Sequence, residues 1–217
     1  MKKILLVSTS HNDMNGHPTG LWLEELAEPY NIFKEAGFEI EIASIKGGEV
    51  PIDIVSIPEG VPAQYEHVMP LLKTTKKLED MLSKDFDAVV FAGGHGPLED
   101  FTNTKSVADI ILKLDENDKV VAGVCHGLAA FLNVKTKEGK DFIAGRKLTG
   151  FTNTEEDLAQ LSSLVPYALE TELVKQGAKF ERAGDFVECV VIDNNLITGQ
   201  NPQSSHKMAV EIVSKLK

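Results

Sequence analysis

The sequence has few cysteines and no long apolar run, and these absences exclude several classes of protein. Two cysteines in 217 residues cannot form a disulfide framework, and no CxxC pair suggests structural zinc. The first apolar stretch, residues 4–7, is too short for the core of a signal peptide, and no stretch approaches the ~20 apolar residues of a membrane span. We therefore expect a cytoplasmic protein with no membrane partner.

Basic residues are also scarce. The chain has 22 lysines and arginines against 33 acidic residues, a formal net charge of −11, and no basic run exceeds two residues. Nucleic acids and anionic surfaces are therefore poor candidate partners. The composition, 42% hydrophobic, is that of an ordinary globular protein, and we expect one domain over residues 1–217. The prolines at about residues 46–70 indicate a short surface insertion within it.

Short apolar runs alternate with helical patterns along the chain. Strands are predicted at residues 3–8, 39–44, 88–92, 119–124 and 147–149, and around Phe180 and Val190. Helices are predicted at residues 21–36, 71–83, 107–114, 126–132, 155–161 and 167–176, and from Asn201 to the end. Because the strands are apolar without alternation, we predict a doubly wound α/β fold, a mostly parallel sheet with helices on both faces.

One cysteine lies between two glycines where a predicted strand ends, in Gly123-Val124-Cys125-His126-Gly127. This is the pattern of a nucleophile elbow, in which a buried strand turns sharply into a helix. The positive end of that helix would favour the thiolate and lower the pKa of Cys125. The alternative is a buried structural cysteine, which is the interpretation that we favour for Cys189.

A glycine-rich loop, Gly93-Gly94-His95, follows the strand at residues 88–92. Ligands of doubly wound sheets bind beyond the carboxyl ends of the strands, so this loop should converge on Cys125. The backbone N–H groups of Gly94 and His126 would form an oxyanion hole, with a plain tight turn as the alternative. We take Gly93, Gly94 and His95 as candidate oxyanion and substrate-binding residues.

Two adjacent acidic residues, Glu24 and Glu25, lie at the start of the first predicted helix. They point about 100° apart, so only one can face the interior, and Glu25 lies nearer the apolar side. The alternative is that both are solvent-exposed acidic residues of the kind common at helix N-termini. Successive side chains of an elbow should point apart, so we expect His126 to be poorly placed to take the Cys125 proton. A buried Glu25 with a raised pKa would be better placed.

Several motifs in register resemble one known family. AGGHGPLED, GVCHG, LTGFTNTEED and TGQNPQSSH, with PTGLWLEELAEPYNIF near the start, are similar to the PfpI-type superfamily. That superfamily has the flavodoxin-like fold of class I glutamine amidotransferases. The branch that the chain resembles most holds the glutathione-independent glyoxalases (glyoxalase III) and their heat-shock chaperone relatives. The downstream HxE pair of strict glutamine amidotransferases is missing, because Lys207-Met208 follows His206, and this argues against glutamine hydrolysis.

The resemblance implies roles for four residues. Cys125 and His126 would be catalytic, Glu25 would hydrogen-bond the thiol, and Glu156 would orient His126, with Glu155 as the fallback. The implied enzyme is a glyoxalase III-type hydro-lyase (D-lactate dehydratase) that converts methylglyoxal or glyoxal, small dicarbonyl substrates, to D-lactate or glycolate. It would need no metal and no organic cofactor, and the family resemblance suggests a homodimer.

Other functions stay open. The apolar residues at 46–70 would suit a holding chaperone that acts in the stress response. Activation of the thiol by His126 and Glu156 would suit an intracellular cysteine amidase or peptidase. Repair of glycated molecules, a deglycase activity, is chemically close to glyoxalase turnover, and Cys125 could also sense oxidation.

Overall fold

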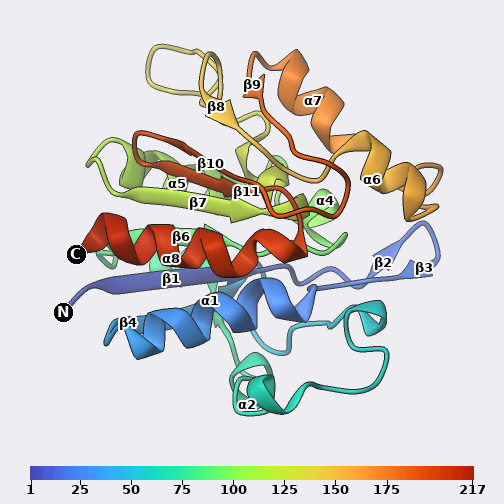
Figure 1. Cartoon of the computed structure of the whole chain (residues 1–217). Helices are drawn as coiled ribbons and strands as arrows, with labels where there is room; N and C mark the ends of the chain where they lie inside the picture. Colours follow the sequence, from blue (N-terminus) through green and yellow to red (C-terminus); the bar gives the residue numbers. More distant parts are fainter.

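A seven-stranded sheet forms the centre of the computed structural model, which describes residues 1–217 (Figure 1). The strands lie in the order β10-β11-β7-β6-β1-β4-β5, and all neighbours are parallel except β10 and β11. Their bounds are β1 Lys3–Ser8, β4 Glu39–Ser44, β5 Lys76–Lys77, β6 Ala88–Phe91, β7 Val120–Val124, β10 Val190–Asp193 and β11 Leu196–Gly199. The predicted doubly wound, mostly parallel α/β fold is confirmed.

Side chains of each inner strand enter two hydrophobic cores in turn. In β1, Ile4 and Leu6 join the core under α1 (Leu23–Glu35) and α8 (Ser205–Leu216), while Leu5 and Val7 join the core under α5 (Lys105–Asp115). Figure 1 shows α1 and α8 side by side over one face of the sheet. Because both faces are covered, the strands read as unbroken apolar runs.

Smaller elements complete the chain. Two short pairs of strands lie outside the main sheet, namely β2 Asp13–Met14 with β3 His17–Pro18, and β8 Lys147–Leu148 with β9 Lys179–Phe180. The remaining α-helices are α2 Met69–Leu72, α3 Leu78–Met81, α4 Pro97–Asp100, α6 Asn153–Leu158 and α7 Leu169–Lys175. Turns of 3-10 helix are found at Ile54–Ser56, Ala63–Tyr65, Cys125–Phe131 and Pro202–Ser204. None of the helices combines the length and apolar character needed to cross a bilayer.

The prediction of one continuous helix over residues 71–83 is wrong. The segment contains α2 and α3, separated by the edge strand β5. Thr75, just before β5, is held by contacts with the segment at residues 44–48. Its N–H donates to Gly48 O, and its hydroxyl lies 2.7 Å from that of Ser44. β-Branched threonines favour such an extended path over a helix. The strand β11 is missing from the predicted strands, because only two of its four residues, Leu196 and Ile197, are apolar.

The segment at residues 46–70 lies against the loop that leads into α1. Leu21 forms a β-bridge with Ile52, and the Thr19 hydroxyl donates to Asp53 Oδ2 at 3.0 Å. Ile52 and other apolar side chains of the segment pack against the core, whereas Ile54 and Val55 are 67% and 59% exposed. Part of the apolar content that suggested a chaperone surface is therefore buried.

The segment after β7 packs so closely against β6 that residue 127 must be glycine. A Cβ atom at residue 127 would lie 2.2 Å from the carbonyl oxygen of Phe91 in β6. The predicted α-helix over 126–132 is instead a run of 3-10 turns, Cys125–Phe131, a tighter helix that suits this approach.

We expect Gly127→Ala to lower the melting temperature by roughly 10 °C, since the new methyl group must displace the backbone of β6. The matched control is Gly184→Ala, where the nearest atom to the added Cβ is a Val187 methyl at 3.6 Å. Thermal unfolding followed by circular dichroism measures both, and equal melting temperatures would contradict the packing argument.

Candidate active site

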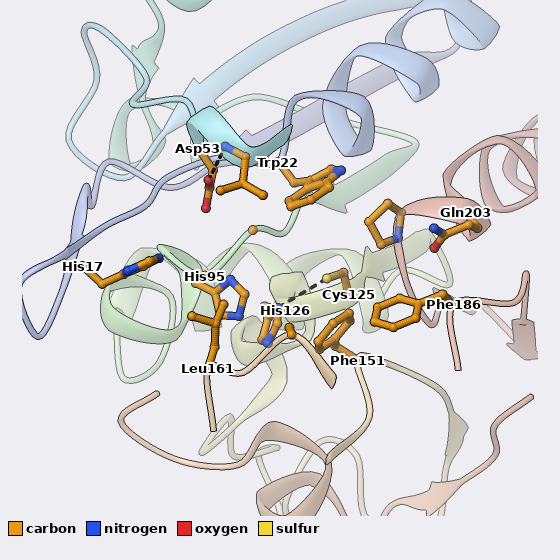
Figure 2. A pocket seen from close by; sticks show the side chains of 14 residues that line it. His17, Trp22, Asp53, His95, Cys125, His126, Phe151, Leu161, Phe186 and Gln203 are labelled. Carbon is orange, nitrogen blue, oxygen red and sulfur yellow. Dashed lines mark hydrogen bonds between the residues drawn. The ribbon is translucent and has the colours of Figure 1, made fainter. Parts of the chain in front are cut away.

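Cys125 lies at the carboxyl end of β7, in a strained turn. Its φ angle is +56°, in the left-handed region that residues with a side chain seldom occupy. The side chain is 4% exposed and lines a cavity of about 390 Å³. Figure 2 shows the sulfur at the base of this cavity, beside His126. The nucleophile elbow that the sequence predicts is therefore present in the backbone, and its thiol can be reached by a small molecule.

The imidazole of His126 contacts the thiol. Cys125 Sγ lies 3.3 Å from His126 Nδ1, and His126 Nε2 lies 2.6 Å from Glu156 Oε2. The expectation that the two neighbouring side chains point apart is wrong, because the left-handed backbone at Cys125 breaks the alternation of the strand. The second oxygen of Glu156 lies 2.7 Å from His95 Nε2, so one carboxylate joins two histidines.

The contacts among Glu156, His126 and His95 determine their charges. Burial alone would raise the pKa of Glu156, but the hydrogen bonds and charge interactions with His126 and His95 lower it far below its ordinary value. The carboxylate therefore accepts hydrogen bonds from both Nε2–H groups. Burial and the neighbouring His95 lower the pKa of His126, so the imidazole is neutral at pH 7. Its Nδ1 lone pair then faces the thiol, as a general base requires.

Glu25 approaches the thiol from the first turn of α1. Its Oε2 accepts a hydrogen bond from Gly93 N–H at 2.8 Å, and the buried Oε1 has no hydrogen-bond partner. The carboxyl also interacts with the Cys125 thiol. A Cβ atom at residue 93 would lie 2.4 Å from Glu25 Oε2, so glycine allows this approach. Burial raises the pKa of Glu25 well above 4.5, which favours the protonated carboxyl.

The expected lowering of the Cys125 pKa is wrong. Burial raises the pKa of the thiol well above 9.0, and the nearby Glu25 raises it further. The backbone N–H groups of Gly94 and His126 interact with the sulfur and oppose this rise. The following 3-10 turns supply no extended helix dipole. The resting thiol is therefore neutral, and a base must remove its proton during attack.

The two adjacent acids of α6 have separate surroundings. Glu156 reaches the histidines, whereas Glu155 closes a capping box with Thr152 and accepts hydrogen bonds from Phe186 N–H, Gln200 and Asn201. Both oxygens of Glu155 are thus occupied by the groups that hold α6 against the loop before β10. The choice that the sequence left open between these acids resolves in favour of Glu156 as the residue beside His126.

The walls of the cavity include residues that the sequence analysis did not select. They are His17, Trp22, Asp53, Val55, Phe151, Ala159, Leu161, Phe186, Pro202 and Gln203. Phe151 packs on the ring of His126 with centroids 4.6 Å apart, and it follows the Thr149-Gly150 pair of a quoted motif. The others come from the first loop, the segment at 46–70, the residues just after α6 and the chain after β9. Trp22, Pro202 and Gln203 lie in quoted motifs, whereas no local pattern indicates that the rest approach Cys125.

His95, His126 and Glu156 could also hold a metal ion, since their ligand atoms all lie within 4.8 Å of one another. Around a tetrahedral zinc ion with bonds of ~2.0–2.1 Å, ligand atoms stand about 3.3 Å apart. The present nitrogen–oxygen distances of 2.6 and 2.7 Å are hydrogen-bond distances. A metal ion would therefore have to replace both hydrogen bonds and move these ligand atoms apart.

Comparisons with known proteins identify the family of this chain. The model of the DJ-1/PfpI family matches residues 19–215. The chain belongs to the DJ-1/PfpI family. It is 31% identical to "Glyoxalase 3" of Candida albicans, with 99% of this chain and 98% of the relative covered. It is 30% identical to "Glutathione-independent glyoxalase HSP31" of Saccharomyces cerevisiae, with 100% and 98% covered.

A solved structure is similar over its whole length. The Rapid Encystment Protein 24 KDa of Francisella tularensis superposes with a TM-score of 0.95 at 38% identity, covering 100% of both chains. The family model and the relatives that are named glyoxalases confirm the predicted family branch. The homodimer and the cytoplasmic location stay predictions for this DJ-1/PfpI protein.

Glu25→Gln is expected to stabilise this DJ-1/PfpI protein at neutral pH. Below pH ~4.5 the carboxyl is protonated in both the folded and the unfolded state, and its titration has no effect. As the pH rises, only the unfolded state ionises until the raised folded pKa is reached, so the wild type loses stability. The variant does not ionise, and its advantage in melting temperature should grow from pH 4 to pH 8.

Glu24→Gln is the matched control, because Glu24 is only half-buried and its pKa is raised less. Melting curves at pH 4, 6 and 8 measure both variants. A constant difference between Glu25→Gln and wild type at all three pH values would show that Glu25 is ionised in the folded protein.

Proposed function

We propose that this protein is a cysteine-dependent, glutathione-independent glyoxalase that converts methylglyoxal to D-lactate and glyoxal to glycolate. The observation that carries the proposal is the presence of two proton carriers at one thiol, His126 with Nδ1 3.3 Å from the sulfur and the buried Glu25. Acyl transfer needs only one such group, here His126. Moving a proton between adjacent carbon atoms needs a second acid–base group. The relatives that are named glyoxalases support the same assignment.

The first step joins the thiol to the aldehyde. His126 Nδ1 takes the thiol proton, the Cys125 sulfur bonds to the aldehyde carbon, and the former carbonyl oxygen becomes negative. The N–H groups of Gly94 and His126, which interact with the sulfur, would hold this oxygen. The imidazolium returns its proton to the oxygen, and a hemithioacetal results.

Glu25 carries out the second step. The protonated carboxyl gives its proton to the ketone oxygen, and the resulting carboxylate removes the hydrogen of the former aldehyde carbon, so that an enediol forms. Glu25 then delivers that proton to the second carbon and takes the remaining hydroxyl proton, which leaves a thioester. One carbon is oxidised while its neighbour is reduced, so the step balances without an external oxidant or hydride carrier.

Water completes the cycle. His126 takes a proton from a water molecule that attacks the thioester carbon, the sulfur–carbon bond breaks, and the thiol regains its proton as the hydroxy acid leaves. Glu156 supports both steps in which His126 becomes positive, because its carboxylate accepts the Nε2–H bond at 2.6 Å.

A cysteine amidase or peptidase is the second candidate. The ordered contacts from Cys125 to His126 to Glu156 favour it, since they have the arrangement of a nucleophile, a base and an orienting acid. The two candidates differ in their use of Glu25. Only the glyoxalase requires this residue to change its protonation state in every turnover.

The test is purified protein with methylglyoxal and no glutathione, assayed for D-lactate. Cys125→Ser and Glu25→Gln should each lower kcat/KM by about 10²-fold or more while the protein stays folded. Turnover by Glu25→Gln at the wild-type rate would remove Glu25 from the mechanism. Hydrolysis of amide substrates that survives Glu25→Gln, without any D-lactate from the wild type, would instead establish the amidase.

Glu155 and Glu156 provide a matched pair in the same assay. Glu156→Gln should lower kcat about 10²-fold, because the base loses its orienting charge. Glu155→Gln should lower the melting temperature by several degrees and leave the rate of the folded protein within about tenfold of wild type. The reverse pattern would show that Glu155 is the orienting acid.

A further inference from the structure

The cavity above Cys125 is much larger than methylglyoxal. Its volume is about 390 Å³, within the ~300–1,000 Å³ of sites that enclose drug-sized ligands. Methylglyoxal carries only a methyl group beside its two carbonyls and would occupy the space of a few water molecules, at ~30 Å³ each. With the dicarbonyl at the sulfur, most of the cavity would be left for a larger substituent.

Aromatic and aliphatic side chains form the walls of this remaining space. In the view of Figure 2, Trp22 lies on one side of Cys125, and Phe151 and Phe186 lie on the other. The two phenylalanine rings have centroids 6.2 Å apart, and Leu161 and Pro202 also line the cavity. Flat apolar groups gain from burial and from offset or edge contacts with such rings.

The charges of the lining disfavour an anionic substituent on the substrate. No lysine or arginine lines the cavity, and its basic side chains are three histidines, of which His126 is held neutral. Asp53 contributes an acidic side chain whose oxygens accept from Thr19 and from the Val55 N–H. A carboxylate or phosphate on the substrate would lose its hydration without a cationic partner.

We infer that the preferred substrates are 2-oxoaldehydes with a bulky, uncharged, apolar substituent, aryl groups above all, and that methylglyoxal fills the site only in part. This inference rests on the proposed function. Phenylglyoxal represents the class. The thiol would add to its aldehyde, the proton transfers described above would follow, and hydrolysis would release mandelate, with the aldehyde carbon oxidised and the ketone carbon reduced.

The experiment compares three probes at pH 8 without glutathione: methylglyoxal, phenylglyoxal and 4-carboxyphenylglyoxal. Initial rates of hydroxy acid formation avoid arginine modification by phenylglyoxal, and neither Arg146 nor Arg182 lines the cavity. The KM for phenylglyoxal should be at least about tenfold below that for methylglyoxal, since a ring is buried in place of a methyl group. The carboxylate should raise KM at least about tenfold relative to phenylglyoxal.

A change of charge at the cavity wall gives a second, independent readout. Val55→Lys places a cation in the lining and should move the KM ratio of the two aryl probes at least about tenfold toward 4-carboxyphenylglyoxal. Ile54→Lys is the matched control. It adds the same charge at the neighbouring exposed position, which does not line the cavity, and should leave the ratio unchanged.

The outcomes separate this inference from the proposed function. Methylglyoxal turnover with an equal or lower KM than phenylglyoxal overturns the substrate class and leaves the glyoxalase intact. Equal KM values for the two aryl probes in the wild type, or equal shifts in both lysine variants, overturn the role of the cavity lining. Absence of turnover with all three probes overturns the proposed function and the inference together.

Discussion

The arrangement depends on one contact, between a buried carboxyl and a buried thiol. Glu25 is fully buried, and Cys125 is almost so, which makes the charged form of each group unfavourable. Glycine at position 93 lets the carboxyl approach the elbow, since any Cβ there would collide with Glu25 Oε2 at 2.4 Å. Burial thus favours the neutral form of both the acid and the nucleophile.

Activation of this neutral thiol falls to the neighbouring imidazole. The left-handed backbone at Cys125 brings the side chains of two successive residues together, and Glu156 fixes the His126 ring with Nδ1 toward the sulfur. His95 shares the same carboxylate and helps to keep His126 neutral. Two groups that can carry a proton, His126 and Glu25, therefore lie at one sulfur atom. A simple acyl transfer requires only one of them.

Sequence patterns predicted the fold where segments are long and apolar. The ranges of β1 and β4 match the prediction, and the elbow glycines indicated Cys125 without any structure. Sequence patterns did not predict the structure where contacts between segments far apart in the sequence determine it. The extended path of Thr75 depends on Ser44 and Gly48, and the walls Val55 and Phe186 reach the cavity from far along the chain. The protonation state of Cys125 depends on burial, which local spacing does not reveal.

The ultraviolet absorbance of thiolate, titrated with pH in a Cys189→Ser background, tests the central claim most directly. The account predicts that the Cys125 thiolate forms only above pH 9.0, and that Glu25→Gln moves its appearance to lower pH because a neighbouring titrating acid is removed. A thiolate already present near pH 6 in the protein with Glu25, and unchanged by Glu25→Gln, would contradict it.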